Sequence, residues 1–187
     1  TICFSFGFGK HELPDKDFDT GCCNVLKGMC SHSGNEHVGR NVFEHLLISM
    51  QGYESWDLDT LITNVLTSPV SATMHCLVHN MPCPFLRTDV DNSGFPCVDW
   101  STAGKQLGVH GSTFAVLLAL VAWYRSQRIK VGFMENVPEF EVDVLRHLLG
   151  DLCEIHVFYL KPEDVGREDL HRVRVLILLL LRGVSVD

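Results

Sequence analysis

The stretch from Thr113 to Leu160 decides the fold, because helix-like and strand-like segments alternate along it. The segments read TFAVLLALVAWYRSQR (113–128), IKVGFM (129–134), EFEVDVLRHLL (139–149) and EIHVFYL (154–160). The first is apolar on most sides and predicts a buried helix, and the third predicts an amphipathic helix that Pro138 introduces and Gly150 ends. The two apolar runs, and a last one at Val173–Leu181, predict strands. Such alternation favours a parallel sheet with helices on both faces.

The residues before this stretch carry weaker patterns. Glu36–Met50 has apolar side chains at helical spacing, and Leu58–Leu66 predicts a second helix. Ala72–Val78 predicts a strand, and Phe4, Phe6 and Phe8 alternate as in a short strand. The run D-V-D-N-S-G at Asp89–Gly94 has the composition of a turn that leads into the next loop.

Composition bounds the class of protein. A chain of 187 residues with 46% apolar content suffices for one globular α/β domain. The formal charge of -8 argues against a surface that grips nucleic acid throughout, although it leaves room for a local basic patch. Eight cysteines without a signal peptide favour reduced thiols in an intracellular protein. The longest apolar runs are too short to span a bilayer, so we expect no membrane role.

One loop stands out as a place for chemistry. The run FPCVDWSTAGKQLG (95–108) puts Cys97 after a proline and before Asp, Ser, Thr and Gly. These residues predict a loop that holds a thiol at a fixed place. A thiol so placed suggests a nucleophile, whereas an isolated cysteine beside proline is more often a small apolar side chain.

Three motifs together resemble the DNA (cytosine-5) methyltransferases. The first is the Cys97 loop, the second is GFMENVP at 132–138 with Glu135, and the third is the R-x-R of Arg172 and Arg174 before the last strand. They occur in the family's order, and the resemblance extends from about Cys30 to Leu181. It implies a doubly wound, mostly parallel sheet of the S-adenosylmethionine-dependent methyltransferase type, with DNA as substrate, or transfer RNA in one branch. A nuclear location would follow in a eukaryote.

The resemblance also implies a role for each motif. Cys97 would add to carbon 6 of cytosine, and Glu135 would contact the ring nitrogen N3 and the exocyclic amine. Asn136 would brace the loop through its side-chain amide. Arg174 would hold the base oxygen at position 2, with Arg172 beside it. The target base would have to be flipped out of the duplex.

The cofactor implied by the resemblance is S-adenosylmethionine. The turn C-S-H-S-G-N at 30–35 lies about where the family has its glycine-rich cofactor turn, so Ser33 and Gly34 are candidate cofactor contacts. Asp89 resembles an acidic position near the adenine. The sequence departs from the family at His32, where a glycine is expected, and at His75 and Cys76, where the family has an acidic residue that binds the ribose.

Further departures concern completeness. Val98 and Leu170 stand where glutamine is usual in the family, and only thirteen residues follow Arg174. We therefore expect residues 1–29 to be an unassigned segment and residues 30–187 to be a partial catalytic domain without the family's target-recognition region. The chain reads as a fragment of a longer protein.

Two other readings stay open. The chain could be a methyltransferase-like domain that has lost catalysis and serves as a nucleic-acid-binding or interaction domain. It could also be a metal-binding module, since ligand-type residues gather at His75, Cys76, His79 and Cys83, with Cys22, Cys23, Cys30 and His32 upstream. The spacing H-C-x2-H-x3-C matches no regular zinc pattern, so no metal site is predicted.

Overall fold

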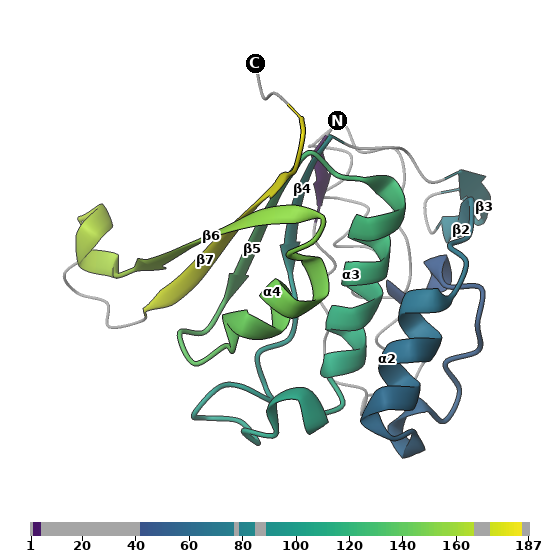
Figure 1. Cartoon of the computed structure of the whole chain (residues 1–187), viewed down its shortest axis with the longest axis horizontal. Helices are drawn as coiled ribbons and strands as arrows, with labels where there is room; N and C mark the ends of the chain where they lie inside the picture. Colours follow the sequence, from purple (N-terminus) through teal and green to yellow (C-terminus); the bar gives the residue numbers. More distant parts are fainter. Residues whose placement is uncertain (1, 5–41, 77–78, 85–88, 167–172, 185–187) are drawn as a thin grey trace.

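The computed structural model describes residues 2–4, 42–76, 79–84, 89–166 and 173–184. The main sheet has five strands in the order β1-β4-β5-β7-β6 (Figure 1). Their bounds are β1 Ile2–Phe4, β4 Val90–Gly94, β5 Val131–Asn136, β6 Cys153–Leu160 and β7 Arg174–Leu181. The α-helices are α2 Leu58–Thr67, α3 Phe114–Gln127 and α4 Val142–Leu149. Short 3-10 helices are η1 Val42–His45, η2 Tyr53–Ser55, η3 Gly108–His110 and η4 Pro162–Val165.

The strand directions confirm the α/β class and the mostly parallel sheet expected from the sequence. Strands β1, β4 and β5 pair in parallel, whereas β7 is antiparallel to both β5 and β6. Four strands thus share one direction and β7 is reversed. The sequence pattern contains no crossover helix between β6 and β7, and a connection without such a helix returns the chain antiparallel.

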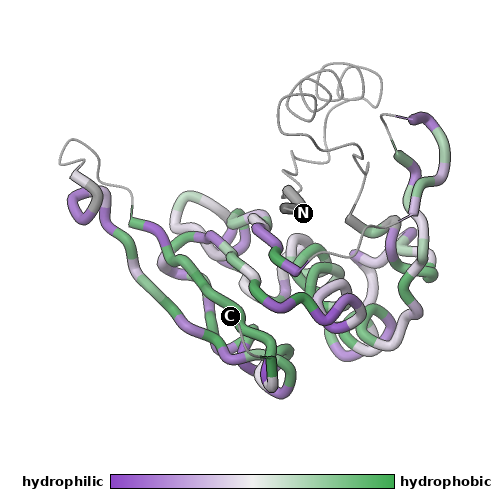
Figure 2. The backbone as a smooth tube through the Cα atoms, turned by 90° about the horizontal axis from the view of Figure 1, so that it is seen from above, coloured by the Kyte–Doolittle hydropathy of each residue, from purple (hydrophilic) through white to green (hydrophobic). Residues whose placement is uncertain are grey.

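The helices build one layer on the sheet. Helix α3 packs against α2 and α4 and has buried residues on nearly all sides, as the sequence predicts. Residues of β5 and β7 that face this layer alternate with outward ones. The core includes Phe114, Leu118, Tyr124, Met134, Leu145, Leu149, Ile177 and Leu179, each at most 1% exposed. Much of β7 is hydrophobic along its length (Figure 2).

The other face of the sheet is open in the described part of the chain. Phe133, Leu176 and Phe158 lie on it, on the neighbouring strands β5, β7 and β6, and are 48%, 37% and 53% exposed. The described helices therefore cover one face of the sheet, where the sequence pattern predicts cover on both. None of these helices is long and apolar enough to cross a membrane.

Strand β4 corrects the interpretation of the D-V-D-N-S-G run as a turn. Residues Val90–Gly94 lie between β1 and β5 in the sheet. The two polar residues that face the helices, Asp91 and Ser93, are only 6% and 7% exposed. Tyr124 of α3 donates a 2.6 Å hydrogen bond to Asp91 Oδ2, and the Ser93 hydroxyl donates to the same oxygen. The tertiary hydrogen bond from Tyr124 and the local one from Ser93 satisfy polar groups that strand propensity disfavours.

Two further expectations differ from the structure. The helix predicted over Glu36–Met50 falls partly outside the described residues, and the described part forms only η1. Leu46 then forms an isolated antiparallel β-bridge with Val70, so the chain is extended where the apolar spacing predicts helix. The strand predicted at Ala72–Val78 is β2 Thr73–Cys76, and it pairs with β3 Met81–Pro84 in a separate hairpin rather than in the main sheet.

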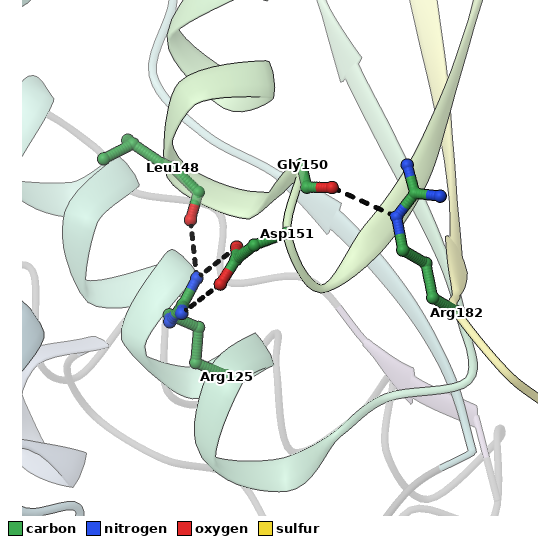
Figure 3. A network of polar contacts seen from close by, with 5 residues as sticks. All are labelled: Arg125, Leu148, Gly150, Asp151 and Arg182. Atoms are coloured by element: carbon green, nitrogen blue, oxygen red, sulfur yellow. Dashed lines mark hydrogen bonds and ion pairs between the residues drawn. The ribbon is translucent and has the colours of Figure 1, made fainter.

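A polar network fixes the turn between α4 and β6 (Figure 3). Arg125 of α3 forms a bidentate pair with Asp151, at 2.8 and 2.6 Å, and donates a 2.9 Å hydrogen bond to the Leu148 carbonyl. Arg182, just beyond β7, donates a 3.1 Å hydrogen bond to the Gly150 carbonyl. The hydrogen bond from Arg125 lowers the pKa of Asp151. The network joins α3, α4 and the β7 end around one turn.

Candidate active site

Four of the predicted catalytic residues lie at or next to one edge of the sheet: Cys97, Glu135, Asn136 and Arg174. Gly94 at the end of β4 lies opposite Glu135 near the end of β5, and Cys97 follows Gly94 after two residues. Because β7 runs antiparallel to β5, its first residue, Arg174, starts at this same edge. The carboxyl ends of β4 and β5 and the amino end of β7 thus meet there. Binding and catalytic groups of open α/β sheets lie at this kind of edge.

Arg174 and Glu135 form an ion pair across the edge. Arg174 Nε lies 2.5 Å from Glu135 Oε1, and the two side chains are 18% and 50% exposed. Arg174 Nη1 also donates a 2.8 Å hydrogen bond to the carbonyl of Val173. The guanidinium is therefore held by two partners, and Glu135 presents a half-exposed carboxylate rather than one enclosed in a dry pocket.

Asn136 links β5 to the segment that precedes Cys97. Its side-chain Nδ2 donates a 3.2 Å hydrogen bond to the carbonyl of Phe95, and its Oδ1 accepts a 2.8 Å hydrogen bond from Val137 N. The residue is only 2% exposed. A buried amide with both ends satisfied fixes the local backbone, because loss of either partner would leave a buried polar group unpaired.

The loop around Cys97 is a tight series of turns. The carbonyl of Cys97 accepts hydrogen bonds from Trp100 N at 3.0 Å and from Ser101 N at 2.7 Å. Further on, Lys105 N donates to the Val98 carbonyl at 2.9 Å. A Cβ at Gly104 would lie 1.9 Å from the Val98 carbonyl oxygen, so the loop closes only with glycine there. Cys97 itself is half-buried and packs against the core.

Asp99 anchors this loop, and the sequence motifs did not single it out. Its side chain is 1% exposed and accepts hydrogen bonds from the backbone N and the hydroxyl of Thr113, at 2.9 and 2.5 Å. A Cβ at Gly111 would lie 1.9 Å from the Asp99 carboxyl carbon. The loop is thereby joined to the start of α3. A buried aspartate paired with a residue fourteen positions later leaves no local sequence signal.

An aromatic cluster packs within and against the same loop. Phe95, Trp100 and Phe140 are buried, and their ring centroids lie 5.0 to 6.0 Å apart in T-shaped pairs. Edge-to-face contacts of this kind add about 0.5–1.5 kcal/mol each beyond simple burial. Among the described residues, the indole Nε1 of Trp100 is a buried polar atom that has no hydrogen-bond partner. The cluster joins the loop to the segment before α4.

Of the three predicted cofactor contacts, Asp89 is the one that the described residues include. Ser33 and Gly34, and also Arg172, lie outside the described residues. Asp89 precedes β4, at the opposite end of that strand from Cys97, and its carboxylate lies 3.2 Å from Lys130 Nζ. Asp89 therefore does not fit a cofactor pocket beside Cys97. Among the described residues, Cys97, Glu135, Asn136 and Arg174 remain the candidate site residues at the other end of β4.

One protein-family model matches the part of the chain that contains most of this candidate site. The model of the C-5 cytosine-specific DNA methylases matches residues 84–152, which include Cys97, Glu135 and Asn136. No curated protein matches the chain.

Among solved structures, a proposed DNA modification methyltransferase encoded within an E. coli prophage is 16% identical, with a TM-score of 0.40. The methyltransferase EhMeth of Entamoeba histolytica is 18% identical, with a TM-score of 0.39, and a mutant DNMT2 of Spodoptera frugiperda is 23% identical, with a TM-score of 0.38. The matches cover 55%, 53% and 52% of this chain and 29%, 34% and 31% of those chains, so the chain spans about a third of their length. Residues 84–152 of this chain are thus similar to the C-5 cytosine-specific DNA methylases.

Proposed function

We propose that this chain carries the nucleophile and the cytosine-binding residues of a DNA (cytosine-5) methyltransferase. The observation that supports this most is the meeting of Cys97, Glu135 and Arg174 at one sheet edge, with Arg174 paired to Glu135. The three residues come from separate motifs of the sequence. Nucleophile, acid and cation at one edge are what addition to a cytosine ring requires.

The first chemical step is addition of the Cys97 thiolate to carbon 6 of cytosine. The new S–C6 bond forms as the electron pair of the C5–C6 double bond shifts to the C4–C5 bond and that of the C4–N3 double bond moves onto N3, which takes up a proton. Carbon 5 thereby becomes enamine-like. Carbon 5 would then take a methyl group from a sulfonium donor, which would leave as a neutral thioether. Loss of the carbon 5 proton to water would re-form the C5–C6 double bond as the S–C6 bond breaks and releases the thiolate. The methyl donor implied by the family is S-adenosylmethionine.

Glu135 and Arg174 would stabilise the charge that addition creates. The Glu135 carboxyl group can share a proton with N3 of the ring as the thiolate adds, and its second oxygen can accept from the exocyclic amine. Arg174 holds Glu135 through Nε, which leaves guanidinium N–H groups for the base oxygen at position 2. Binding of a base would enclose Glu135, which is half-exposed without it.

Asn136 and Asp99 would hold the nucleophile loop in place. Asn136 ties the end of β5 to the Phe95 carbonyl, two residues before Cys97. Asp99 ties the loop after Cys97 to the start of α3. These are positioning residues, since their contacts are to the protein. They keep the thiol at a fixed distance from the Glu135 edge, which covalent addition demands.

The substrate we propose is DNA, with the target cytosine extruded from the helix before it can reach Cys97. A cytosine of single-stranded RNA could contact the same three side chains, Cys97, Glu135 and Arg174. The test therefore includes both nucleic acids. A catalytically silent binding domain would bind either of them without forming a covalent adduct.

The test is covalent trapping with 5-fluorocytosine. Fluorine replaces the proton that must leave carbon 5, so the methylated adduct cannot release Cys97. The full chain is incubated with S-adenosylmethionine and a 5-fluorocytosine oligonucleotide, as DNA and as RNA, and adducts are detected by denaturing gel and mass spectrometry. We expect an adduct whose peptide contains Cys97. Cys97→Ala should abolish it, and Cys153→Ala, which removes a buried thiol elsewhere, should not.

Absence of any adduct from a folded wild-type chain would overturn the active-enzyme proposal. If the same chain bound the oligonucleotide without an adduct, the binding-domain reading would replace it. An adduct that persisted in Cys97→Ala would show that another nucleophile operates.

A further inference from the structure

A small hairpin outside the main sheet brings three metal-ligand residues together. Strands β2 and β3 pair antiparallel, with Met74 opposite Cys83 and Cys76 opposite Met81. Cys76 and Cys83 therefore project from the same face of the hairpin, in a diagonal relation. His75 lies opposite Pro82 and projects from the other face. The hairpin lies on the other side of the molecule from β6 and β7 (Figure 1).

His79 lies in the turn above the two sulfurs. Its Nδ1 atom is 3.4 Å from the Sγ atom of Cys76 and 3.4 Å from that of Cys83. All three ligand atoms lie within 4.8 Å of one another. The turn is closed by a 2.7 Å hydrogen bond from Asn80 N to the Cys76 carbonyl, and Asn80 has a φ of 54°. Asparagine tolerates this left-handed conformation.

These distances match the edges of a tetrahedral metal site. With zinc–sulfur bonds of about 2.3 Å and zinc–nitrogen bonds of about 2.0–2.1 Å, tetrahedral angles place sulfur and nitrogen about 3.5 Å apart. The observed separations of 3.4 Å are close to that value. A single ion can thus be reached by both sulfurs and by Nδ1 with small movements of the side chains.

The donor atoms select the class of ion. Two thiolates and one imidazole are soft or intermediate ligands, which favour zinc over magnesium or calcium. Two thiolates also neutralise a divalent charge. Both cysteines are buried and neither is in a disulfide, whereas His79 is exposed. The site is therefore open on the His79 side, where water or another ligand can complete four-coordination.

We propose that Cys76, His79 and Cys83 bind one divalent ion of the zinc class and cross-link the β2–β3 hairpin. A hairpin of two four-residue strands is marginally stable in isolation. Metal binding would stabilise it, because the free energy of coordination adds to that of folding. The sequence spacing alone did not single out this set, since it grouped His75 with the other three. This proposal is independent of the methyltransferase activity.

The test is direct metal binding by the full reduced chain. Protein purified under reductant and stripped with chelator is titrated with Co²⁺, and then with Zn²⁺ in competition. We expect about one equivalent of Co²⁺ with the visible absorption of a tetrahedral site and a thiolate-to-cobalt charge-transfer band, displaced by Zn²⁺. Cys76→Ser and Cys83→Ser should abolish both signals. His79→Ala should weaken binding by more than about tenfold.

The matched controls separate this site from adventitious thiol binding. His75→Asn changes the neighbouring histidine on the opposite hairpin face, and Cys153→Ser removes another buried thiol, so both should bind like wild type. Far-UV circular dichroism of each variant without metal checks that it folds. A Cys76→Ser/Cys83→Ser double variant keeps every other cysteine.

Three results would overturn the proposal. The double variant could bind as much metal as wild type, or His75→Asn could lose binding to the same extent as His79→Ala. Alternatively, peptide mass mapping could find a Cys76–Cys83 disulfide in the untreated protein together with no metal binding after reduction. Each of these would mean that the three side chains meet for packing or oxidation rather than for a metal.

Discussion

Arg174 Nε lies 2.5 Å from Glu135 Oε1, at the point where antiparallel β7 begins beside the end of β5. Two residues far apart in sequence are neighbours because β7 is reversed. A β7 parallel to β5 would have placed Arg174 at the opposite edge of the sheet, away from Glu135.

The first prediction concerns this pair. Arg174→Ala and Glu135→Gln should each lower the rate of covalent adduct formation by at least about tenfold, since each removes a group that stabilises charge in the transition state. Global stability should change by no more than about 1 kcal/mol, because Glu135 is half-exposed and solvent screens the pair. Adduct kinetics and denaturant unfolding measure the two effects. Arg182→Ala, just beyond the opposite end of β7, is the control and should leave adduct formation unchanged.

The effects of the two substitutions should also fail to add. In the double variant the loss of rate should be smaller than the product of the single losses, as expected for residues that act as a unit. Strict additivity would indicate that the ion pair has no part in the chemistry.

Asn136 should matter for stability as well as for the loop. Asn136→Ala leaves the Phe95 carbonyl and the Val137 N–H without their partner in a buried place, which costs about 1–3 kcal/mol. Asn136→Asp keeps the acceptor for Val137 N but places a buried carboxylate oxygen against the Phe95 carbonyl oxygen. We therefore expect Asp to be at least as destabilising as Ala at neutral pH, measured by urea unfolding. Equal stability of wild type and Asn136→Ala would contradict the bracing role.

Gly104 and Gly94 provide a matched pair near the nucleophile. A methyl group at Gly104 would lie 1.9 Å from the Val98 carbonyl oxygen, whereas one at Gly94 would meet nothing within 4 Å. Gly104→Ala should destabilise the chain by about 1–3 kcal/mol, or displace the loop and slow adduct formation. Gly94→Ala should leave stability nearly unchanged. If both substitutions had the same effect, the close approach at Gly104 would not limit the loop.

Because Asp91 is buried, we expect it to give the free energy of unfolding an unusual dependence on pH. Burial raises its pKa, against the opposing effect of hydrogen bonds from Ser93 and Tyr124. A raised pKa in the folded state means that this group stabilises the fold below its unfolded pKa of about 3.9 and that the contribution is lost as pH rises through the folded value. Asp91→Asn should therefore become more stable relative to wild type as pH increases. Unfolding free energies at a series of pH values from about 4 to 7 measure this.

Asp151 serves as a control, because its pKa is shifted in the opposite direction from that of Asp91. Its pKa is lowered, mainly by the hydrogen bond from Arg125, so its contribution is present above the unfolded pKa and is lost as pH falls. Asp151→Asn should thus cost stability at neutral pH and little under acidic conditions. The effect is small, because the carboxylate is largely exposed. Matching pH trends for Asp91→Asn and Asp151→Asn would contradict both assignments.

Several elements were predictable because their signals are local. Helices α2, α3 and α4 and strands β5, β6 and β7 appear within a few residues of the segments that the periodicity predicts. The spacing of apolar residues predicts these elements, and Pro138 and Gly150 mark where the segment that contains α4 begins and ends. The family motif around Cys97 was also readable, and the family match includes it.

Strand β4 and the hairpin could not be predicted in this way. Asp91 and Ser93 make β4 look like a turn, and only Tyr124 from α3 explains how a carboxylate and a hydroxyl sit in a buried strand. The ligand set of the hairpin was likewise obscured. Adjacent His75 and Cys76 look alike in sequence, and the strand pairing sends them to opposite faces.

The sequence by itself determined the alternation of helices and strands and the identity of the candidate nucleophile, because side-chain periodicity and loop chemistry act over a few neighbouring residues. The tertiary structure decided which residues meet. The reversal of β7 joins Arg174 to Glu135, and Thr113 holds Asp99 at the end of the Cys97 loop. Such contacts depend on strand direction and on burial, which couple residues distant in the chain and which no local pattern encodes.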